Sequence, residues 1–292
     1  MSIPVIISAL LNGLILGLIY SLITAGVSLI YGIMKVSNFA HGEFYMIGAY
    51  ASYFATTLLK IPTFASLPFS LMAGFVAGYT VERFLISDTY KKKIERPGEY
   101  AMLTTLGLSI LFQNIVREFY SPFMKSTLPI LPGTVPFYLI SISWDRVLAA
   151  IISVITLVSL YLFIGKTKTG RAWRATAQNK VGALLTGVNM ERQCHISYGV
   201  GTALAALAGY LLAPLYGIYP SMGYWPLTIS FVAMTLGGLG SIEGSLIAGI
   251  IIGLAHSFTA SFISPSYADV GMYIVLIIVI LVRPTGLFGR KD

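Results

Sequence analysis

The segment from Val5 to Met34 contains no charged residue, and it constrains the fold more than any other part of the sequence. A helix of about 20 apolar residues crosses a hydrocarbon core that is roughly 30 Å thick. Only 10% of the residues are charged, and the mean hydropathy is +0.82, whereas about 25% of a soluble domain is charged. Membrane β-strands would alternate over segments of about 10 residues. The sequence therefore predicts an all-α, polytopic membrane helical bundle, with residues 1–292 as a single transmembrane domain.

Further apolar runs follow at regular intervals along the chain, and the sequence "GGLGSIEG" (237–244) divides the longest of them into two short halves. We expect about eight or nine membrane segments in total, including glycine-broken half-helices. The beginning, "MSIPVIIS", lacks a basic region and predicts a retained helix, not a cleaved signal. The further runs are Phe39–Leu59, Phe64–Val81, Ala101–Glu118, Trp144–Gly165, Ile196–Ile218, Leu227–Phe258 and Val270–Val282.

The cations lie in three clusters, within residues 83–96, 166–192 and 283–291, and these clusters hold most of the 19 Lys and Arg residues. The positive-inside rule places all three on the cytoplasmic side. This predicts cytoplasmic loops at about 83–100 and 166–195, an outward loop at about 120–143, an outside N-terminus and a cytoplasmic C-terminus. Membrane orientation explains the net charge of +8 without nucleic acid. Cys194 is the only cysteine, so no intrachain disulfide can form.

The stretch "VSNFAHGEFYMIGAY" (36–50) places Asn38, His41 and Glu43 at a membrane edge. Ionisable groups inside a membrane are costly and usually face a cavity or a partner. Two interpretations stay open: a place on a translocation pathway, or a local ion pair with Lys35 at the level of the lipid headgroups.

Glycines recur at short intervals in the stretch "TLGGLGSIEGSLIAGIIIGL" (235–254). Gly249 and Gly253 predict close packing of helices, because small residues let two backbones approach. The more polar part predicts a turn that lines a cavity or faces the cytoplasm, and we assign it to the translocation pathway by its residues Gly237, Gly238, Gly240 and Ser241.

The stretch "GRAWRATAQNKVGALLTGVNMERQCH" (170–195) is basic and polar within an otherwise apolar chain. Apolar residues recur at helical spacing between Ala177 and Val188 and predict one short amphipathic helix. Arg171, Arg174 and Gln178 fall on another face, and Gly187 is placed to end the helix. The helix could rest on anionic lipid or fit a groove in a partner protein.

No motif for chemistry of the chain's own is present. The "GKT" at Gly165–Thr167 lacks the first glycine of a phosphate-binding loop, since Leu160 stands there. The three histidines are far apart in the sequence. The residues therefore predict no catalytic site, no metal site and no enzyme activity, and a membrane enzyme using His41 and Glu43 is the weakest alternative.

Four segments together resemble the LivH-type permeases of branched-chain amino acid ABC importers: "YGIMKVSNFAHGEFYMIGAY" (31–50), "GRAWRATAQNKVGALLTGVN" (170–189), "TLGGLGSIEGSLIAG" (235–249) and "RPTGLFGR" (283–290). The resemblance extends along essentially the whole chain. It implies a subunit of the bacterial cytoplasmic (inner) membrane that pairs with a second, LivM-like permease, two ATPase subunits and a periplasmic substrate-binding protein. It implies no cofactor in this chain, because ATP and Mg²⁺ bind to the ATPase subunits.

The resemblance also implies that a cytoplasmic helix docks in a groove of the ATPase and couples ATP hydrolysis to transport. The residues that we assign to this coupling element are Gly170, Arg171, Arg174, Ala175, Val181, Leu184, Leu185 and Gly187.

Two departures and two alternatives remain. The first cytoplasmic loop reads "FLISDTYKKKIERPGEY" where the family has a short "RPLR"-like element, and Glu243 replaces a residue that is neutral in many relatives. Permeases for urea and short amides share similar motifs, so they are one alternative. A self-sufficient channel or secondary transporter is the other.

Overall fold

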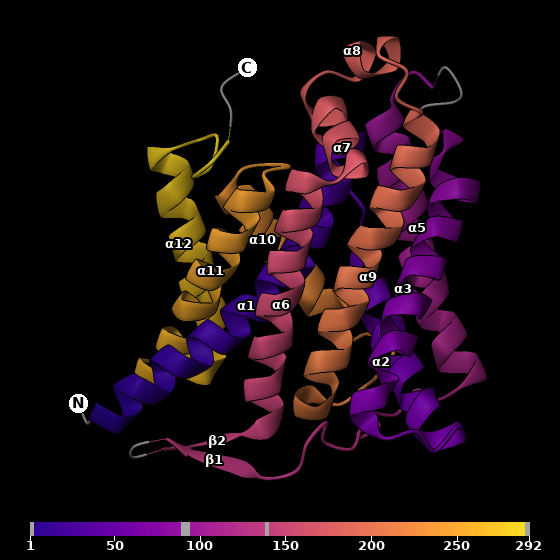
Figure 1. Ribbon diagram of the computed structural model, residues 1–292. Helices are drawn as coiled ribbons and strands as arrows, with labels where there is room; N and C mark the ends of the chain where they lie inside the picture. Colours follow the sequence, from indigo (N-terminus) through magenta and orange to yellow (C-terminus); the bar gives the residue numbers. More distant parts are fainter. Residues whose placement is uncertain (1–2, 89–93, 138–139, 290–292) are drawn as a thin grey trace.

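The computed structural model describes residues 3–88, 94–137 and 140–289 (Figure 1). In this part of the chain, long helices run side by side in one bundle, and two short helices, α7 and α8, stand at one end of it. The helices are α1 (Ile3–Met34), α2 (His41–Leu58), α3 (Leu67–Val81), α5 (Pro97–Phe119), α6 (Trp144–Lys166), α7 (Lys168–Gln178), α8 (Lys180–Leu185), α9 (Met190–Tyr216), α10 (Tyr224–Gly237), α11 (Ile242–Phe262) and α12 (Ala268–Val282). Short 3₁₀ turns cover Thr63–Ser66 and Pro265–Tyr267, and a π-helical turn, η2 (Glu82–Ile86), extends α3.

The prediction of an all-α bundle is confirmed. Six of the described helices are long and apolar enough to cross a membrane, sometimes together with their flanking turns. The count of eight or nine crossings stays a prediction. The expected outward loop contains a feature that the sequence did not predict: strands β1 (Thr134–Phe137) and β2 (Ile140–Ser143) pair antiparallel. This hairpin and the N-terminal end of α1 lie at the end of the bundle opposite α7 and α8 (Figure 1).

The centre of the bundle consists of α1, α9 and the helices packed on them. Helix α1 packs closely along α11, where the Cβ of an alanine at Gly253 would overlap the backbone of Gly17 and one at Gly249 would overlap Ser21. The prediction that Gly249 and Gly253 serve helix packing is confirmed. In α9, Pro214 lies in the last turn of the helix, which Gly217 ends with a φ of 72°.

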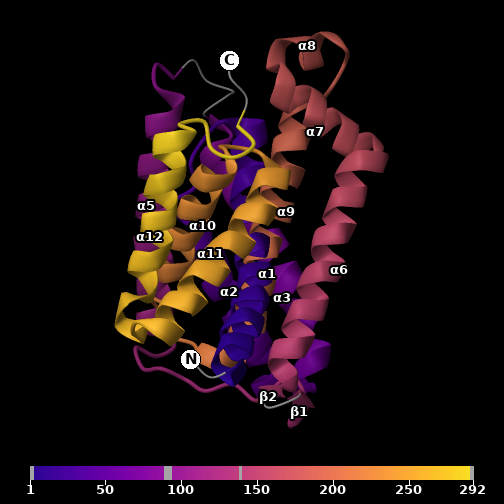
Figure 2. The same ribbon diagram turned by 90° about the vertical axis from the view of Figure 1, so that its left-hand side faces the viewer.

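Helices α5 and α12 stand on the side of the bundle opposite α6 (Figure 2). Of all residues of α5, the structure buries only Ala101, Thr105 and Leu108. This helix therefore leaves most of its apolar surface uncovered by its own chain.

A candidate translocation site and a candidate coupling element

Two of the helices begin inside the bundle. After α1, the non-helical segment from Lys35 to Ala40 returns into the bundle, so that Nε2 of His41 lies 3.2 Å from the carbonyl oxygen of Ile23. Because a helix rises about 1.5 Å per residue, Ile23 lies roughly 16 Å along α1 from its last residue. A Cβ added at Gly42 would overlap the carbonyl oxygen of Gly223, just before α10. The N-termini of α2 and α10 therefore meet within the bundle.

From this junction the two helices run in opposite directions. The far end of α2 lies with the end of α5, where the rings of Phe54 and Tyr120 are 4.8 Å apart. The far end of α10 lies with the end of α1, since a Cβ at Gly240 would stand 2.9 Å from the Cα of Gly32. Half-helices with N-termini at the membrane centre are typical of transporter binding sites.

Polar side chains gather at the junction, and we call them the central site: Asn38, His41 and Glu43 with Thr105, Ser109 and Gln113 of α5. Oε1 of Glu43 accepts hydrogen bonds from Ser109 (2.9 Å) and Gln113 (2.7 Å). Asn38, His41 and Glu43 are all buried. Within the described part of the chain, Oε2 of Glu43 and Nδ1 of His41 have no hydrogen-bond partner. A buried polar atom without a partner costs about 1–3 kcal/mol, so this site is suited to a polar ligand.

The interpretation that Glu43 forms an ion pair with Lys35 at headgroup level is wrong. Lys35 is exposed, and its ammonium lies 5.7 Å from the centroid of the Tyr31 ring. Glu43 instead lies deeper, because the returning segment carries it to α5. The carboxylate is also in the first turn of α2, where the helix dipole stabilises negative charge.

The sequence analysis missed the contribution of α5. Thr105 accepts a hydrogen bond from the backbone N–H of Phe39 at 3.0 Å, and Ser109 and Gln113 bind Glu43. The three residues are spaced by four, which places them on one face of a helix. A polar stripe of this kind in an apolar helix is the signal that could have found them.

The turn Gly237–Ser241 lies apart from the central site. Gly238 and Gly240 adopt φ values of 103° and 79°, and the Ser241 hydroxyl accepts a hydrogen bond from Gly244 N at 3.0 Å. The length of α10, about 21 Å at 1.5 Å per residue, separates this turn from the N-terminus of α10. The turn packs against the end of α1, and its role on a translocation pathway stays a prediction.

The predicted coupling helix consists of two helices. The expected single helix over Ala177–Val188 is wrong, because Asn179 is extended (φ −153°) and its side chain caps α8 by accepting from Gly182 N at 3.0 Å. Asparagine favours such caps over helix interiors. The prediction for Gly187 is confirmed: it has a φ of 83°, and the N–H groups of Gly187 and Val188 donate to the carbonyls of Leu184 and Ala183, the Schellman pattern.

Helix α7 is fixed to the bundle. The Cβ of any residue larger than glycine at position 170 would overlap the backbone of Ile164 in α6. The buried ring of Trp173 lies 5.4 Å from that of Phe163, and the Arg174 guanidinium donates to the carbonyl of Gly165 at 3.2 Å. Arg171 is exposed and Ala175 is half-buried.

Helix α8, in contrast, presents apolar side chains outward. Val181, Leu184 and Leu185 are 65%, 54% and 84% exposed. Figure 1 shows α8 at the outermost point of this end of the molecule. Exposed apolar side chains that lie together are typical of an interaction surface, and docking of a partner at α8 stays a prediction.

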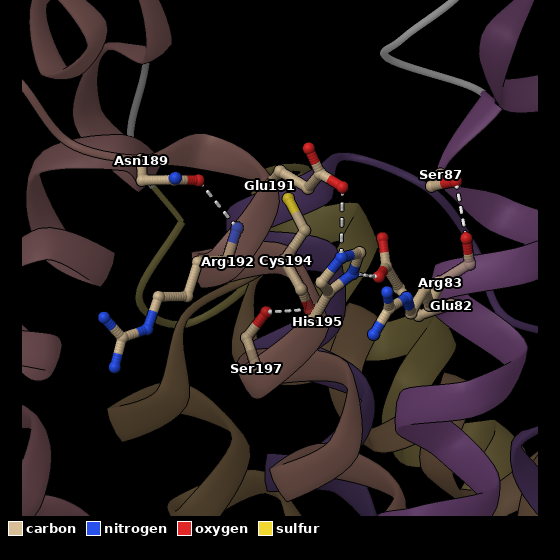
Figure 3. Close-up of polar contacts among 9 residues, drawn as sticks. All are labelled: Glu82, Arg83, Ser87, Asn189, Glu191, Arg192, Cys194, His195 and Ser197. Atoms are coloured by element: carbon tan, nitrogen blue, oxygen red, sulfur yellow. Dashed lines mark hydrogen bonds and ion pairs between the residues drawn. The ribbon is translucent and has the colours of Figure 1, made fainter.

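Beneath α7 and α8, a buried histidine joins two helices (Figure 3). His195 of α9 pairs through Nδ1 with Glu82 of η2, and its Nε2 lies 3.4 Å from Oε1 of Glu191. The ring of Tyr79 packs 5.2 Å from the His195 ring. The cluster ties the end of α3 to the beginning of α9. The predicted first cytoplasmic loop (83–100) overlaps η2 and the beginning of α5, and its residues 89–93 lie outside the described part of the chain.

A family model described as the branched-chain amino acid transport system / permease component matches residues 9–280. The chain belongs to this family. The permease is 35% identical to the high-affinity branched-chain amino acid transport system permease protein BraD of Pseudomonas aeruginosa, over 97% of this chain and 95% of BraD. It is 34% identical to LivH of Escherichia coli K12, over 96% of this chain and 94% of LivH. The resemblance inferred from four segments is confirmed.

Two more distant similarities extend the comparison. LivM of Escherichia coli K12 is 25% identical to the permease, over 93% of this chain and 68% of LivM. The solved structure of PsaBC from Streptococcus pneumoniae in complex with Fab has a TM-score of 0.51 at 12% identity, covering 95% of this chain and 92% of that chain. The second likeness shows a shared fold.

Proposed function

We propose that the permease is the membrane-spanning subunit of an ATP-driven importer that translocates branched-chain, hydrophobic amino acids by alternating access. The observation that carries the proposal is the similarity along nearly the whole chain to permeases named for such a system. The chain itself catalyses no reaction. ATP and Mg²⁺ bind to partner subunits, and no cofactor resides in this chain.

The proposed complex contains a second, LivM-like permease, two ATPase subunits and a periplasmic substrate-binding protein. Similarity to both LivH and LivM supports pairing of two homologous permeases. The uncovered surface of α5 supports a neighbour within the membrane, and the exposed residues of α8 support an ATPase at its tip.

In the bacterial inner membrane, the end that carries α7 and α8 faces the cytoplasm. The C-terminal end of the described chain lies at this end, and the N-terminal end of α1 lies at the opposite one (Figure 1). Cations of the 166–192 cluster on α7, α8 and the first turn of α9 therefore share one end, as the positive-inside rule requires. The N-terminus then lies outside.

Force enters the bundle through α7 and α8. ATP-driven closure of the ATPase pair displaces α8, and the contacts of Gly170, Trp173 and Arg174 with α6 pass the displacement to the bundle. Nucleotide can shift the balance of states only through a difference in its interaction with them. A change from 1:99 to 99:1 requires about 5.5 kcal/mol, which two sites of nucleotide closure can supply.

The substrate passes the central site. The orphaned Oε2 of Glu43 suits the ammonium of an amino acid, and the neighbouring rings of Phe39 and Phe231, 5.1 Å apart, suit an aliphatic side chain. This combination favours amino acids over urea and short amides.

The proposal is tested by purifying the permease with its native partners and reconstituting it in liposomes. We expect leucine uptake that requires enclosed ATP and the binding protein, with urea as a poor competitor. Uptake by the permease alone without nucleotide would instead indicate a channel or secondary transporter. Competition by urea or acetamide at the level of leucine would indicate an amide permease.

The variant Arg174→Glu should uncouple the reconstituted complex. Its carboxylate cannot donate to the carbonyl of Gly165 and would repel it, so α7 loses one attachment to α6. We expect leucine uptake per ATP hydrolysed to fall about tenfold, as for loss of about 1.4 kcal/mol. The exposed neighbour Arg171→Glu, which the structure does not attach to α6, tests whether charge alone has this effect. Normal uptake by Arg174→Glu would contradict the assignment.

The variant Glu43→Gln should slow transport without affecting insertion. Glutamine preserves the shape and can still accept from Ser109 and Gln113, but the charge is lost. We expect the rate of leucine uptake to fall about tenfold or more, since hydrogen bonds to charged groups contribute about 1.5–3 kcal/mol. The control is Gln113→Glu in the Glu43→Gln background, which returns a carboxylate to the same site. An unchanged rate in Glu43→Gln would remove Glu43 from the pathway.

A further inference from the structure

A cavity lies outside the central site, where α8 meets the ends of α1 and α9 at the proposed cytoplasmic end of the bundle. The cavity has a volume of about 600 Å³, which is within the range of small-molecule sites. Its walls come from four places: the end of α1 with Lys35 and Val36, the beginning of α5, helix α8, and the beginning of α9.

The wall carries charges of both signs. Lys35, Lys180 and Glu191 all line it, and Oε1 of Glu191 also lies 3.4 Å from Nε2 of His195. Lys180 is half-buried and donates to the carbonyl of Met34 at 2.8 Å. Burial, together with the nearby Lys35 ammonium, lowers the pKa of Lys180. Among the described residues, no carboxylate forms an ion pair with either lysine, so an anionic group would be stabilised between them.

The rest of the wall is mostly aliphatic. Cation, carboxylate and aliphatic surface together match one chemical class: a zwitterion with an aliphatic side chain, whose carboxylate meets the two lysines and whose ammonium meets Glu191. The aliphatic residues of the wall are Met34, Val36, Leu184, Val188 and Met190.

The cavity lies where a bound ligand would link α8 to the segment that follows α1. One wall belongs to α8, which we propose to move with the ATPase. Another part of the wall, Lys35 and Val36, begins the segment that leads to Asn38 and His41 in the central site. A ligand held between Lys180 and Lys35 therefore ties the moving element to the segment that shapes the pathway.

We propose that this cavity is a regulatory site, which binds an aliphatic amino acid from the cytoplasm and slows import once the product has accumulated. This inference rests on the proposed function. Binding favours the state in which α8 is close to the end of α1, and the ligand shifts the transport cycle by its preference for that state.

The test measures initial leucine uptake by the reconstituted complex at increasing concentrations of leucine enclosed with ATP. We expect enclosed leucine to inhibit uptake and ATP hydrolysis together. Lys180→Met and Glu191→Gln should each raise the concentration for half-inhibition about tenfold or more, because each removes a charged contact. If Lys180→Met is poorly folded, the isosteric Glu191→Gln variant still decides.

The matched control is Arg192→Gln. Arg192 follows Glu191 in the same helix turn, and Figure 3 shows its side chain directed away from Glu191 and His195. It does not line the cavity, so its half-inhibition should equal that of the wild type. Glu43→Gln should lower the rate of uptake but leave half-inhibition unchanged.

A direct binding measurement separates this proposal from the proposed function. Labelled leucine is equilibrated with the purified complex, without nucleotide or binding protein, and binding should weaken in Glu191→Gln and persist in Glu43→Gln. Equal binding by the wild type and Glu191→Gln, or equal half-inhibition in all variants, would overturn the regulatory site. Absence of any ATP-dependent uptake by the wild type would overturn the proposed function, and the binding measurement would still report on the cavity. A lipid headgroup that is tightly bound in the cavity and that leucine does not displace would also overturn the regulatory site.

Discussion

Replacing Leu185 by aspartate is expected to abolish leucine transport while leaving the permease folded and inserted. The side chain is 84% exposed at the tip of α8, so its loss removes little from the folded chain. In the proposed complex it is buried against the ATPase, where a central apolar anchor contributes about 2–4 kcal/mol to binding. This corresponds to at least about a 30-fold weaker association. Co-purification of the ATPase and uptake in proteoliposomes measure the two effects.

The same substitution at Leu128 provides the control. Leu128 is 69% exposed and lies in the segment before the β1–β2 hairpin, at the opposite end of the bundle. Leu128→Asp should therefore retain the ATPase. If Leu185→Asp also retained the ATPase and transported normally, the tip of α8 would not be the coupling surface.

Replacing Gly42 by leucine is expected to destabilise the folded bundle strongly. The Cβ alone would overlap the carbonyl oxygen of Gly223, and the remaining side chain would separate the N-termini of α2 and α10. Overpacking in a core costs about 1–3 kcal/mol even when flexible side chains can yield, and here the obstacle is backbone. We expect a fall in thermal stability and in the yield of monodisperse protein, both measured in detergent.

Gly107→Leu serves as the matched control, because a Cβ at this exposed glycine of α5 would contact nothing within 4 Å. It should be close to neutral in stability. A Gly42→Leu permease as stable as Gly107→Leu would contradict the close approach of α2 and α10.

Local sequence patterns predicted the helices well. The ends of most predicted apolar runs, such as the uncharged run from Val5, lie within a few residues of the ends of observed helices. The length of an apolar run and the residues of a turn are local properties, so they can be read from the sequence. Gly187, Gly249 and Gly253 were also assigned correctly, since the conformation of a helix end and the close approach of two helices both require a small residue.

Depth within the bundle was not predictable in the same way. Nothing local in "VSNFAHGEF" shows that the chain turns back by roughly 16 Å along α1, so Glu43 was placed equally well at the headgroups or on a pathway. The pairing of His195 with Glu82 joins residues more than one hundred positions apart. Such a long-range contact cannot be predicted from local patterns in a single sequence. The break at Asn179 was missed because the apolar spacing continues across it.

The attachment of α5 has a consequence for how the transporter opens. An element held by apolar area must open a void when it shifts, at a cost that rises with the volume of the void. Helix α5 has little such area to lose, and its hydrogen bonds to Phe39 and Glu43 are ones that a passing solute or water can replace. Within this chain, a shift of α5 would therefore open less void than a shift of α1 or α11, whose backbones approach closely at Gly17 and Gly253.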